Sequence, residues 1–286
     1  MEDGLPVTPT PRLRQPPERE RSNPWRPGAW LLLLAGAALA ARIGVLAPAA
    51  ARAGAVEEFI AAGDRHYAAA RLEDAVHEYA QALQDAPGNP TALCRLARAE
   101  SELGETQKGD EQRRTWASAV MHARDAVRAA PDSAQPHTRL AVALGRQALR
   151  EGPRTKLALS KEIKSEVDRA LALDASQALA WHVLAVWNVK VTGLNMFERM
   201  AANAVLGGVP KGASYENAEQ AFQKAIALEP AYVNHHVEYG RLLRDLHKNE
   251  DARRELEQAI SLPATSSALD TRYQADARAL LEKLPH

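Results

Sequence analysis

GDRHYAAARLEDAVHEYAQALQDAP, at residues 63–87, shares its pattern of small and apolar side chains with GRLLRDLHKNEDARRELEQAISLPA, at residues 240–264. In the first stretch the pattern runs through Gly63, Ala75, Tyr79, Ala82 and Pro87 at intervals of 12, 4, 3 and 5 residues, and the second stretch repeats these intervals. Small residues at this spacing let two paired helices approach closely, which is typical of tetratricopeptide-like repeats. The sequence therefore predicts paired helices that stack on one another.

Three more helix pairs are predicted between these two stretches. In each of them a longer interval separates the two halves of the pattern, and in the fourth pair the interval grows by 21 residues. This insertion contains a short apolar helix within residues 195–206, which we expect to pack on the repeats. The predicted fold class is all-α, a tetratricopeptide-like α-solenoid of about five helix pairs, with stretched middle repeats and a C-terminal capping helix at residues 265–284.

The composition argues against several classes of function. The chain carries 36 Lys and Arg against 36 Asp and Glu, so no overall positive field favours nucleic acid. Its single cysteine, Cys94, rules out an internal disulfide and a cysteine-rich zinc site; we expect it to face the concave groove as a small filler. The sequence contains no nucleophile, phosphate-binding or metalloprotease motif. We therefore predict a non-enzymatic protein with no catalytic residues and no cofactor.

The adjacent histidines His235 and His236 are the sequence's clearest suggestion of a metal ligand pair. On a helix, adjacent side chains point about 100° apart, so the two rings cannot readily share one ion. We predict no metal site and expect these histidines to lie on a partly solvated helix face.

The first 53 residues differ from the rest of the chain. Residues 1–28 hold seven of the 17 prolines and few apolar side chains, so this tail is predicted to be disordered. Residues 29–53 begin with a 13-residue apolar run and are predicted to target a membrane. Two alternatives remain, a signal peptide cleaved near Ala53 or an anchor through residues 29–51 that must accommodate Arg42. The helical-repeat domain is predicted to occupy residues 55–286.

The first helix of each pair is expected to line the concave side of the solenoid. Helical spacing then predicts a partner-binding groove in which cations lie over an apolar floor. Such a surface suits an acidic peptide segment or an anionic phospholipid. Its predicted residues are Arg98, Val142, Arg146, His182, Val186, Val189, Lys190, Arg241 and Arg244.

The fourth helix pair carries the most specific motifs. These are WHVL at residues 181–184, FER at residues 197–199, YENA at residues 215–218 and FQKA at residues 222–225. With them, residues 57–284 resemble the regulator of microtubule dynamics family, although Met196 stands where that family usually has Trp before Phe-Glu-Arg. The resemblance implies a non-enzymatic helical-repeat protein. It also implies an association with microtubules or spindle poles, or, as in one animal member, a mitochondrial outer-membrane tether whose repeat domain binds phospholipid.

We therefore expect a scaffold that is tethered to a membrane or exported across it, and that binds a segment of a protein partner in its groove. Tubulin or microtubules are expected as partners only because of the family resemblance. The alternatives are a phospholipid-binding or phospholipid-transfer module at a membrane contact, and an envelope assembly factor if the source is bacterial. The expected location is a membrane, reached through residues 29–51 or by export. The resemblance alternatively implies the cytoplasm, microtubules or the mitochondrial outer membrane.

Overall fold

A computed structural model of the chain describes residues 49–196, 199–200 and 208–285, and these residues are helical or lie in connecting turns. Ala49–His286 forms one compact unit. The predicted tail, residues 29–48 of the predicted targeting segment and most of the predicted insertion helix at residues 195–206 lie outside the described residues. Across the described ranges, no helix combines the length and the apolar character needed to span a bilayer.

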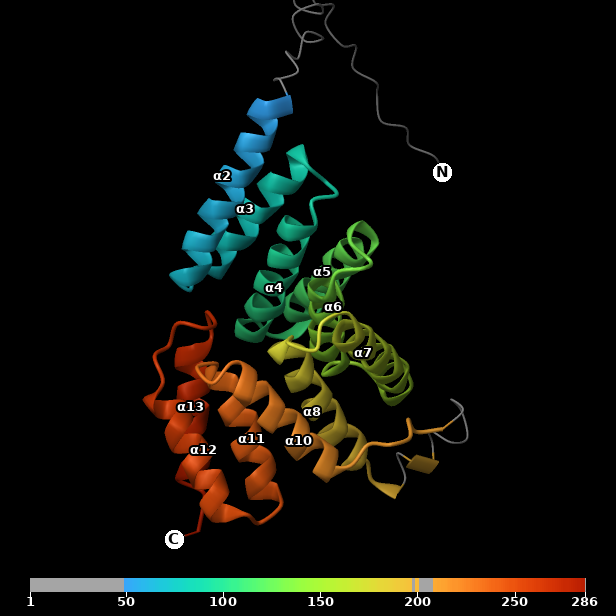
Figure 1. The fold of residues 1–286 in the computed structure, drawn as a ribbon, viewed down its shortest axis with the longest axis vertical. Helices are drawn as coiled ribbons and strands as arrows, with labels where there is room; N and C mark the ends of the chain where they lie inside the picture. The colour runs from blue at the N-terminus through green and yellow to red at the C-terminus, as the bar shows by residue number, and fades with distance from the viewer. Residues whose placement is uncertain (1–48, 197–198, 201–207, 286) are drawn as a thin grey trace, which may run out of the picture. The chain divides into compact units, whose positions relative to one another are not determined.

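The described residues contain eleven helices, which form five consecutive pairs and a final single helix, as the sequence predicts (Figure 1). The pairs are α2 (Ala49–Ala68) with α3 (Leu72–Asp85), α4 (Pro90–Thr106) with α5 (Gly109–Ala129), α6 (Ala134–Ala148) with α7 (Pro153–Leu173), α8 (Ala178–Thr192) with α10 (Tyr215–Leu228), and α11 (Val233–Asp245) with α12 (Asn249–Ser261). Helix α13 (Asp270–Leu281) packs on α11 and α12 and covers the last pair. The predicted α-solenoid is confirmed.

The stretched middle repeats have two different structural causes. In the second pair only Gln107 and Lys108 separate α4 from α5, because the additional residues lengthen the helices. Helices α5 and α7 are each 21 residues long, against 14 for α3. In these two pairs the longer interval predicted from the sequence is therefore accommodated by longer helices and not by a longer connection. In the fourth pair the additional residues do lie in the connection, at residues 193–214.

Glycines on the first helix of a pair allow the second helix to approach. A Cβ atom at Gly63 would overlap the ring of Tyr79, and one at Gly240 would lie 2.8 Å from the side chain of Leu256. Both contacts join residues of the repeating sequence pattern. Gly104 follows the same rule without belonging to that pattern, since its Cβ would overlap the indole of Trp116. These three positions bring the paired helices into direct backbone-to-side-chain contact.

The same histidine contact fixes two of the first helices. In α6, the His137 ring lies 2.8 Å from the carbonyl oxygen six residues earlier and 2.6 Å from the Glu166 carboxylate of α7. In α11, His236 lies 2.9 Å from the carbonyl six residues earlier and 2.7 Å from Glu255 of α12. Each ring therefore joins the turn before its helix to the second helix of the pair.

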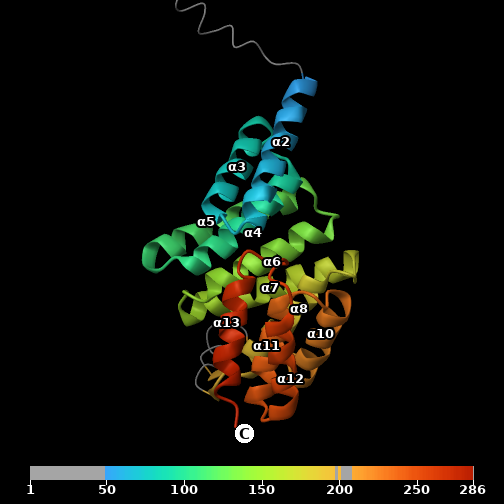
Figure 2. The ribbon, with the colours of Figure 1, turned by 90° about the vertical axis from the view of Figure 1, so that its left-hand side faces the viewer.

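The segment between α12 and α13 returns to the second helix pair (Figures 1 and 2). The Arg98 guanidinium of α4 donates to the Ser266 carbonyl, 168 residues away, over 2.8 Å. The Ser267 hydroxyl donates to the Glu102 carboxylate over 3.0 Å, and Arg272 donates to the Glu105 carbonyl. One apolar cluster also extends from Leu103 to the residues of α13. The C-terminal cap is thus joined to α4 as well as to its neighbouring pair.

The helix-pair contacts predict a clear difference between glycine positions. Gly63→Ala and Gly104→Ala should each lower the free energy of unfolding by about 1 to 3 kcal/mol, because an aromatic ring must move to admit the methyl group. Chemical denaturation of the purified variants measures this loss.

Gly145 in α6 provides the matched control. A Cβ there meets nothing within 4 Å, so Gly145→Ala should stabilise the chain by about 0.5 to 1 kcal/mol through helix propensity. Equal effects at all three positions would contradict the close approach of the paired helices.

Candidate partner-binding groove

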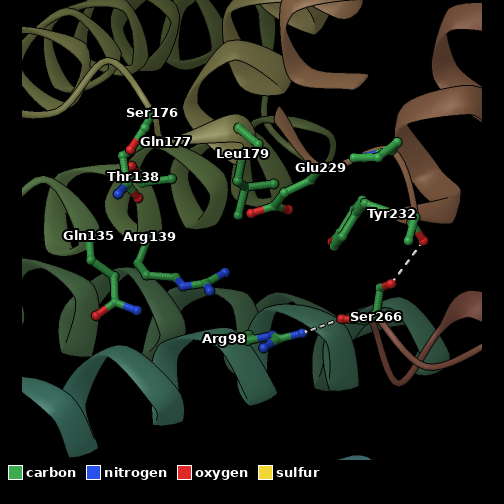
Figure 3. Close-up of a pocket in the computed structure, with 13 residues that line it drawn as sticks. Arg98, Gln135, Thr138, Arg139, Ser176, Gln177, Leu179, Glu229, Tyr232 and Ser266 are labelled. Atoms are coloured by element: carbon green, nitrogen blue, oxygen red, sulfur yellow. Dashed lines mark hydrogen bonds between the residues drawn. The ribbon is translucent and has the colours of Figure 1, made fainter. Parts of the chain in front are cut away.

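Helices α4, α6, α8 and α11 border two adjoining cavities, which we call the groove. The first cavity, of about 450 Å³, has a largely polar lining that includes Gln135, Ser176 and Gln177 (Figure 3). The second cavity, of about 230 Å³, adds an apolar wall. That wall consists of Val142, Leu149, Val183 and Val186. The two cavities share Arg98, Arg139, Leu179 and Tyr232, so they lie next to each other.

Most of the predicted groove residues lie together. The second cavity is lined by seven of the nine, namely Arg98, Val142, Arg146, His182, Val186, Lys190 and Arg241. Val189 is absent from the lining, and it packs against the core cluster that extends to α13. Arg244 is also absent, since its guanidinium turns to the neighbouring Asp245 at 2.6 Å. Seven of the nine predicted residues therefore share one cavity, and their role in binding a partner stays a prediction.

Acidic side chains neutralise several of the predicted cations. Arg98 lies 3.4 Å from Glu102 and 4.0 Å from the centre of the Tyr67 ring. Arg146 pairs with Glu105. Sequence reasoning missed both carboxylates, although they lie four and seven residues after Arg98 and therefore on the same face of α4. On α11, Arg241 pairs with Glu238 at 2.8 Å.

Arg139 and Tyr232 are two polar residues of the groove whose side chains have no hydrogen-bond or ion-pair partner among the described residues. Burial, and then the like charge of Arg98, lower the pKa of the Arg139 guanidinium. Burial raises the pKa of the Tyr232 phenol to about 12, so this group keeps its proton at neutral pH. Arg139 was not predicted, although it lies three and seven residues before Val142 and Arg146 and so shares their helix face.

Three helices begin at the groove without a side-chain cap. The residues preceding α6, α8 and α11 are Ser133, Gln177 and Tyr232, and none of their side chains accepts a capping hydrogen bond. In α8, the backbone N–H groups of Ala178 and Leu179, which line the first cavity, make no hydrogen bond within the described chain. Free N–H groups and the helix dipole make such ends favourable for negative charge.

A buried pair of histidines lies at the second cavity, which His182 lines. His182 and His235 stack with their ring centres 4.9 Å apart, and their Nδ1 atoms are 3.1 Å apart. Burial lowers the pKa of His182 from the usual 6.5 to about 3, and that of His235 to about 2. Both rings are therefore neutral, and one donates a hydrogen bond to the other.

Two expectations about these residue types need correction. His235 and His236 are both buried, because the first contacts His182 and the second contacts Glu255, so neither lies on a partly solvated face. Cys94 does not face the groove; it is buried beside Leu93, and burial raises the pKa of its thiol to about 11. Its role as a filler is consistent with this packing. Within the described ranges, no three histidine, cysteine or acidic side chains are arranged to hold a metal ion.

Comparisons with known proteins identify a family. The sequence model for regulator of microtubule dynamics protein 1-3 matches residues 59–285. Regulator of microtubule dynamics protein 3 of Bos taurus is 30% identical over 186 residues, which cover 64% of this chain and 39% of that protein. Regulator of microtubule dynamics protein 1 of Bos taurus is 26% identical over 240 residues, which cover 83% of this chain and 74% of that protein. This chain thus spans well under half the length of its protein 3 relative.

The fold also has a solved counterpart. A thermophilic tetratricopeptide-repeat protein of Thermus thermophilus superposes with a TM-score of 0.57 at 18% identity, over 78% of this chain and 98% of that one. At this identity the likeness concerns the fold alone.

The histidine pair predicts a loss of stability in mild acid. In the unfolded chain each histidine titrates near pH 6.5, whereas the folded values are about 3 and about 2. The unfolded state therefore binds protons first, and the stabilisation present above pH 6.5 is lost as the pH falls towards 3. Between about pH 7.5 and about pH 5 the loss should be of the order of 2 kcal/mol per histidine.

Urea denaturation at the two pH values measures this effect, with the double variant His182→Asn/His235→Asn as control. The variant should show a smaller loss of stability on acidification than the parent, whatever its stability at neutral pH. The same pH dependence in both proteins would contradict the neutral, buried pair.

Proposed function

This chain belongs to the regulator of microtubule dynamics protein 1-3 family, and from that membership we propose that it is a non-enzymatic scaffold that binds a segment of a protein partner in the groove. The observation that carries the proposal is the convergence of side chains from four successive first helices on two adjoining cavities. A concave surface with a polar part and an apolar part can hold the main chain and the side chains of an extended segment.

The state of the ionisable groups supports binding over catalysis. His182 is neutral and bonded to His235, and Arg98, Arg146 and Arg241 are paired with carboxylates. General acid–base catalysis needs a titratable group near neutral pH that can reach a substrate. The pKa values of about 3 and about 2 take both histidines out of that range.

The wider role of the protein rests on its relatives and on the N-terminal sequence. The relatives' name, regulator of microtubule dynamics, makes tubulin or a microtubule-associated protein a candidate partner. The apolar run from residue 29 supports tethering to a membrane or export across it. The match covers only 39% of the protein 3 relative. Partners that bind the remainder of that relative are therefore not proposed for this chain.

One observation favours phospholipid binding as a second candidate. The wall formed by Val142, Leu149, Val183 and Val186 gives the second cavity a surface that an acyl chain could contact. Against this, the same cavity of about 230 Å³ is bordered by seven charged side chains, which an acyl chain would have to desolvate. The protein-partner reading therefore has the stronger support.

Photo-crosslinking in cells tests the proposal. A benzophenone amino acid replaces Val186, which lines the second cavity, or Glu257, which is exposed on α12 away from the groove. The Val186 probe should give a discrete protein adduct that the Glu257 probe does not give.

Gly145 provides a variant that blocks the groove. It lines the second cavity, and a Cβ there meets no atom within 4 Å, so Gly145→Trp should fill the cavity without disturbing α6. This variant should lose most of the adduct, whereas Gly145→Ala should keep it. Lipid adducts in place of protein adducts would support the second candidate, and equal adducts at Val186 and Glu257 would contradict the proposal.

A further inference from the structure

We propose that Arg139 and Tyr232 form a carboxylate-binding site, so that the groove selects an acidic peptide segment with a neighbouring apolar side chain. This inference rests on the proposed function, which it deepens by naming the chemistry of the ligand. The two side chains come from different helix pairs, α6 and the turn before α11, and both line each of the two cavities.

The first observation is that the guanidinium N–H groups of Arg139 are available to donate hydrogen bonds. In Figure 3 its side chain extends from α6 into the space above Arg98, while Arg98 is bonded to Ser266. Arginine has five N–H donors in a planar fork that matches the two oxygens of a carboxylate. Here none of these donors is used within the described chain. Burial, and then repulsion from Arg98, lower the pKa of Arg139, and an anion at this point would relieve the repulsion.

The second observation concerns the phenol of Tyr232. Its ring lies 4.5 Å from the ring of His235, which fixes its orientation. Its hydroxyl has no partner in the described chain and is protonated, so it can donate a hydrogen bond to the same anion. A phenol and a guanidinium on opposite sides of a cavity provide three donors for one carboxylate group.

The third observation is that basic side chains outnumber acidic ones in the lining of the two cavities. The two cavities are lined by the bases Arg98, Arg139, Arg146, Lys190 and Arg241, and by the acids Glu102, Glu229 and Glu238. Glu229 faces the first cavity, but it makes no ion pair with Arg139; its nearest basic atom is the His235 ring at 4.0 Å. The balance is therefore positive, and the uncapped start of α8 adds to it.

The shape of the groove distinguishes a peptide from other anions. The site lies where the polar first cavity meets the second, whose wall includes Val142 and Val186. The free N–H groups of Ala178 and Leu179 can donate to the main chain of a peptide, as well as to an anion. A carboxylate on Arg139, followed by an apolar side chain in the second cavity, uses all of these features together.

Panning of a displayed library of random octapeptides on the full chain tests the inference directly. The selected peptides should be rich in Asp and Glu. The best binder is then synthesised with these residues intact or replaced by Asn and Gln, and the amide version should bind at least about tenfold more weakly. Failure to select any binder, or equal affinity of the two versions, would overturn the inference.

Matched variants assign the effect to the proposed residues. Arg139→Gln should weaken the acidic peptide at least about tenfold, Arg139→Lys should do so less, and Tyr232→Phe, which keeps the ring, should weaken it several-fold. Arg114→Gln on the exposed side of α5 removes the same charge and should have no effect. Helicity and the thermal midpoint of each variant confirm folding, since Arg139 has no partner to lose. An unchanged affinity in Arg139→Gln would overturn the site.

Two further outcomes separate this inference from the proposed function. If the Val186 probe still captures a protein in Arg139→Gln as in the parent, the groove binds its partner without this carboxylate site, and only the inference fails. If vesicles of phosphatidylcholine with phosphatidylglycerol bind more tightly than the peptide, and Arg139→Gln weakens that binding, the site recognises a lipid phosphate. Absence of any crosslinked protein would instead contradict the proposed function.

Discussion

The carboxylate of Glu102 joins parts of the chain that are far apart in the sequence. It accepts hydrogen bonds from the Tyr67 hydroxyl at 2.6 and 2.7 Å and from the Ser267 hydroxyl at 3.0 Å, and Arg98 lies 3.4 Å away. A buried carboxylate is tolerated only where its oxygens are satisfied in this way. Helix α2, helix α4 and the segment before α13 are therefore held at one point. Arg98 is fixed there too, at the border of the groove.

This arrangement decides which charges remain for a ligand. Glu102 and Glu105 of α4 occupy Arg98 and Arg146, and Glu238 occupies Arg241, so three of the lining arginines serve the structure of the groove. The remaining arginine, Arg139, lies where the two cavities meet. Among the described residues, the lining cations without a carboxylate partner are thus reduced to Arg139 and Lys190, and of these only Arg139 shares both cavities with Tyr232. Specific recognition follows more readily from so few groups than from diffuse charge.

The sequence predicts the architecture because tetratricopeptide-like packing depends on local spacing. Gly63 and Gly240 can be recognised from their sequence separation from Tyr79 and Leu256. Seven groove residues can be predicted from the helical spacing of side chains along each first helix taken alone. The ion pair of Arg98 with Glu102 within α4 could also have been predicted from helical spacing. The hydrogen bond between Arg98 and Ser266 could not be predicted in this way. It depends on the cumulative rotation from one helix pair to the next, and the helix lengths that set this rotation cannot be derived from the repeat pattern.

The return of the C-terminal segment to α4 changes how the repeats depend on one another. In an open array each repeat touches only its neighbours, so the end units can fray independently of the rest. Here the detachment of α13 must also break the hydrogen bonds of Arg272 and Tyr273 with Glu105, 167 and 168 residues away, and open the core cluster that reaches Leu103. Local melting at the C-terminus is therefore coupled to the second helix pair. The chain should unfold as one cooperative unit, and its late, long-range contacts should slow folding relative to an open array of equal length.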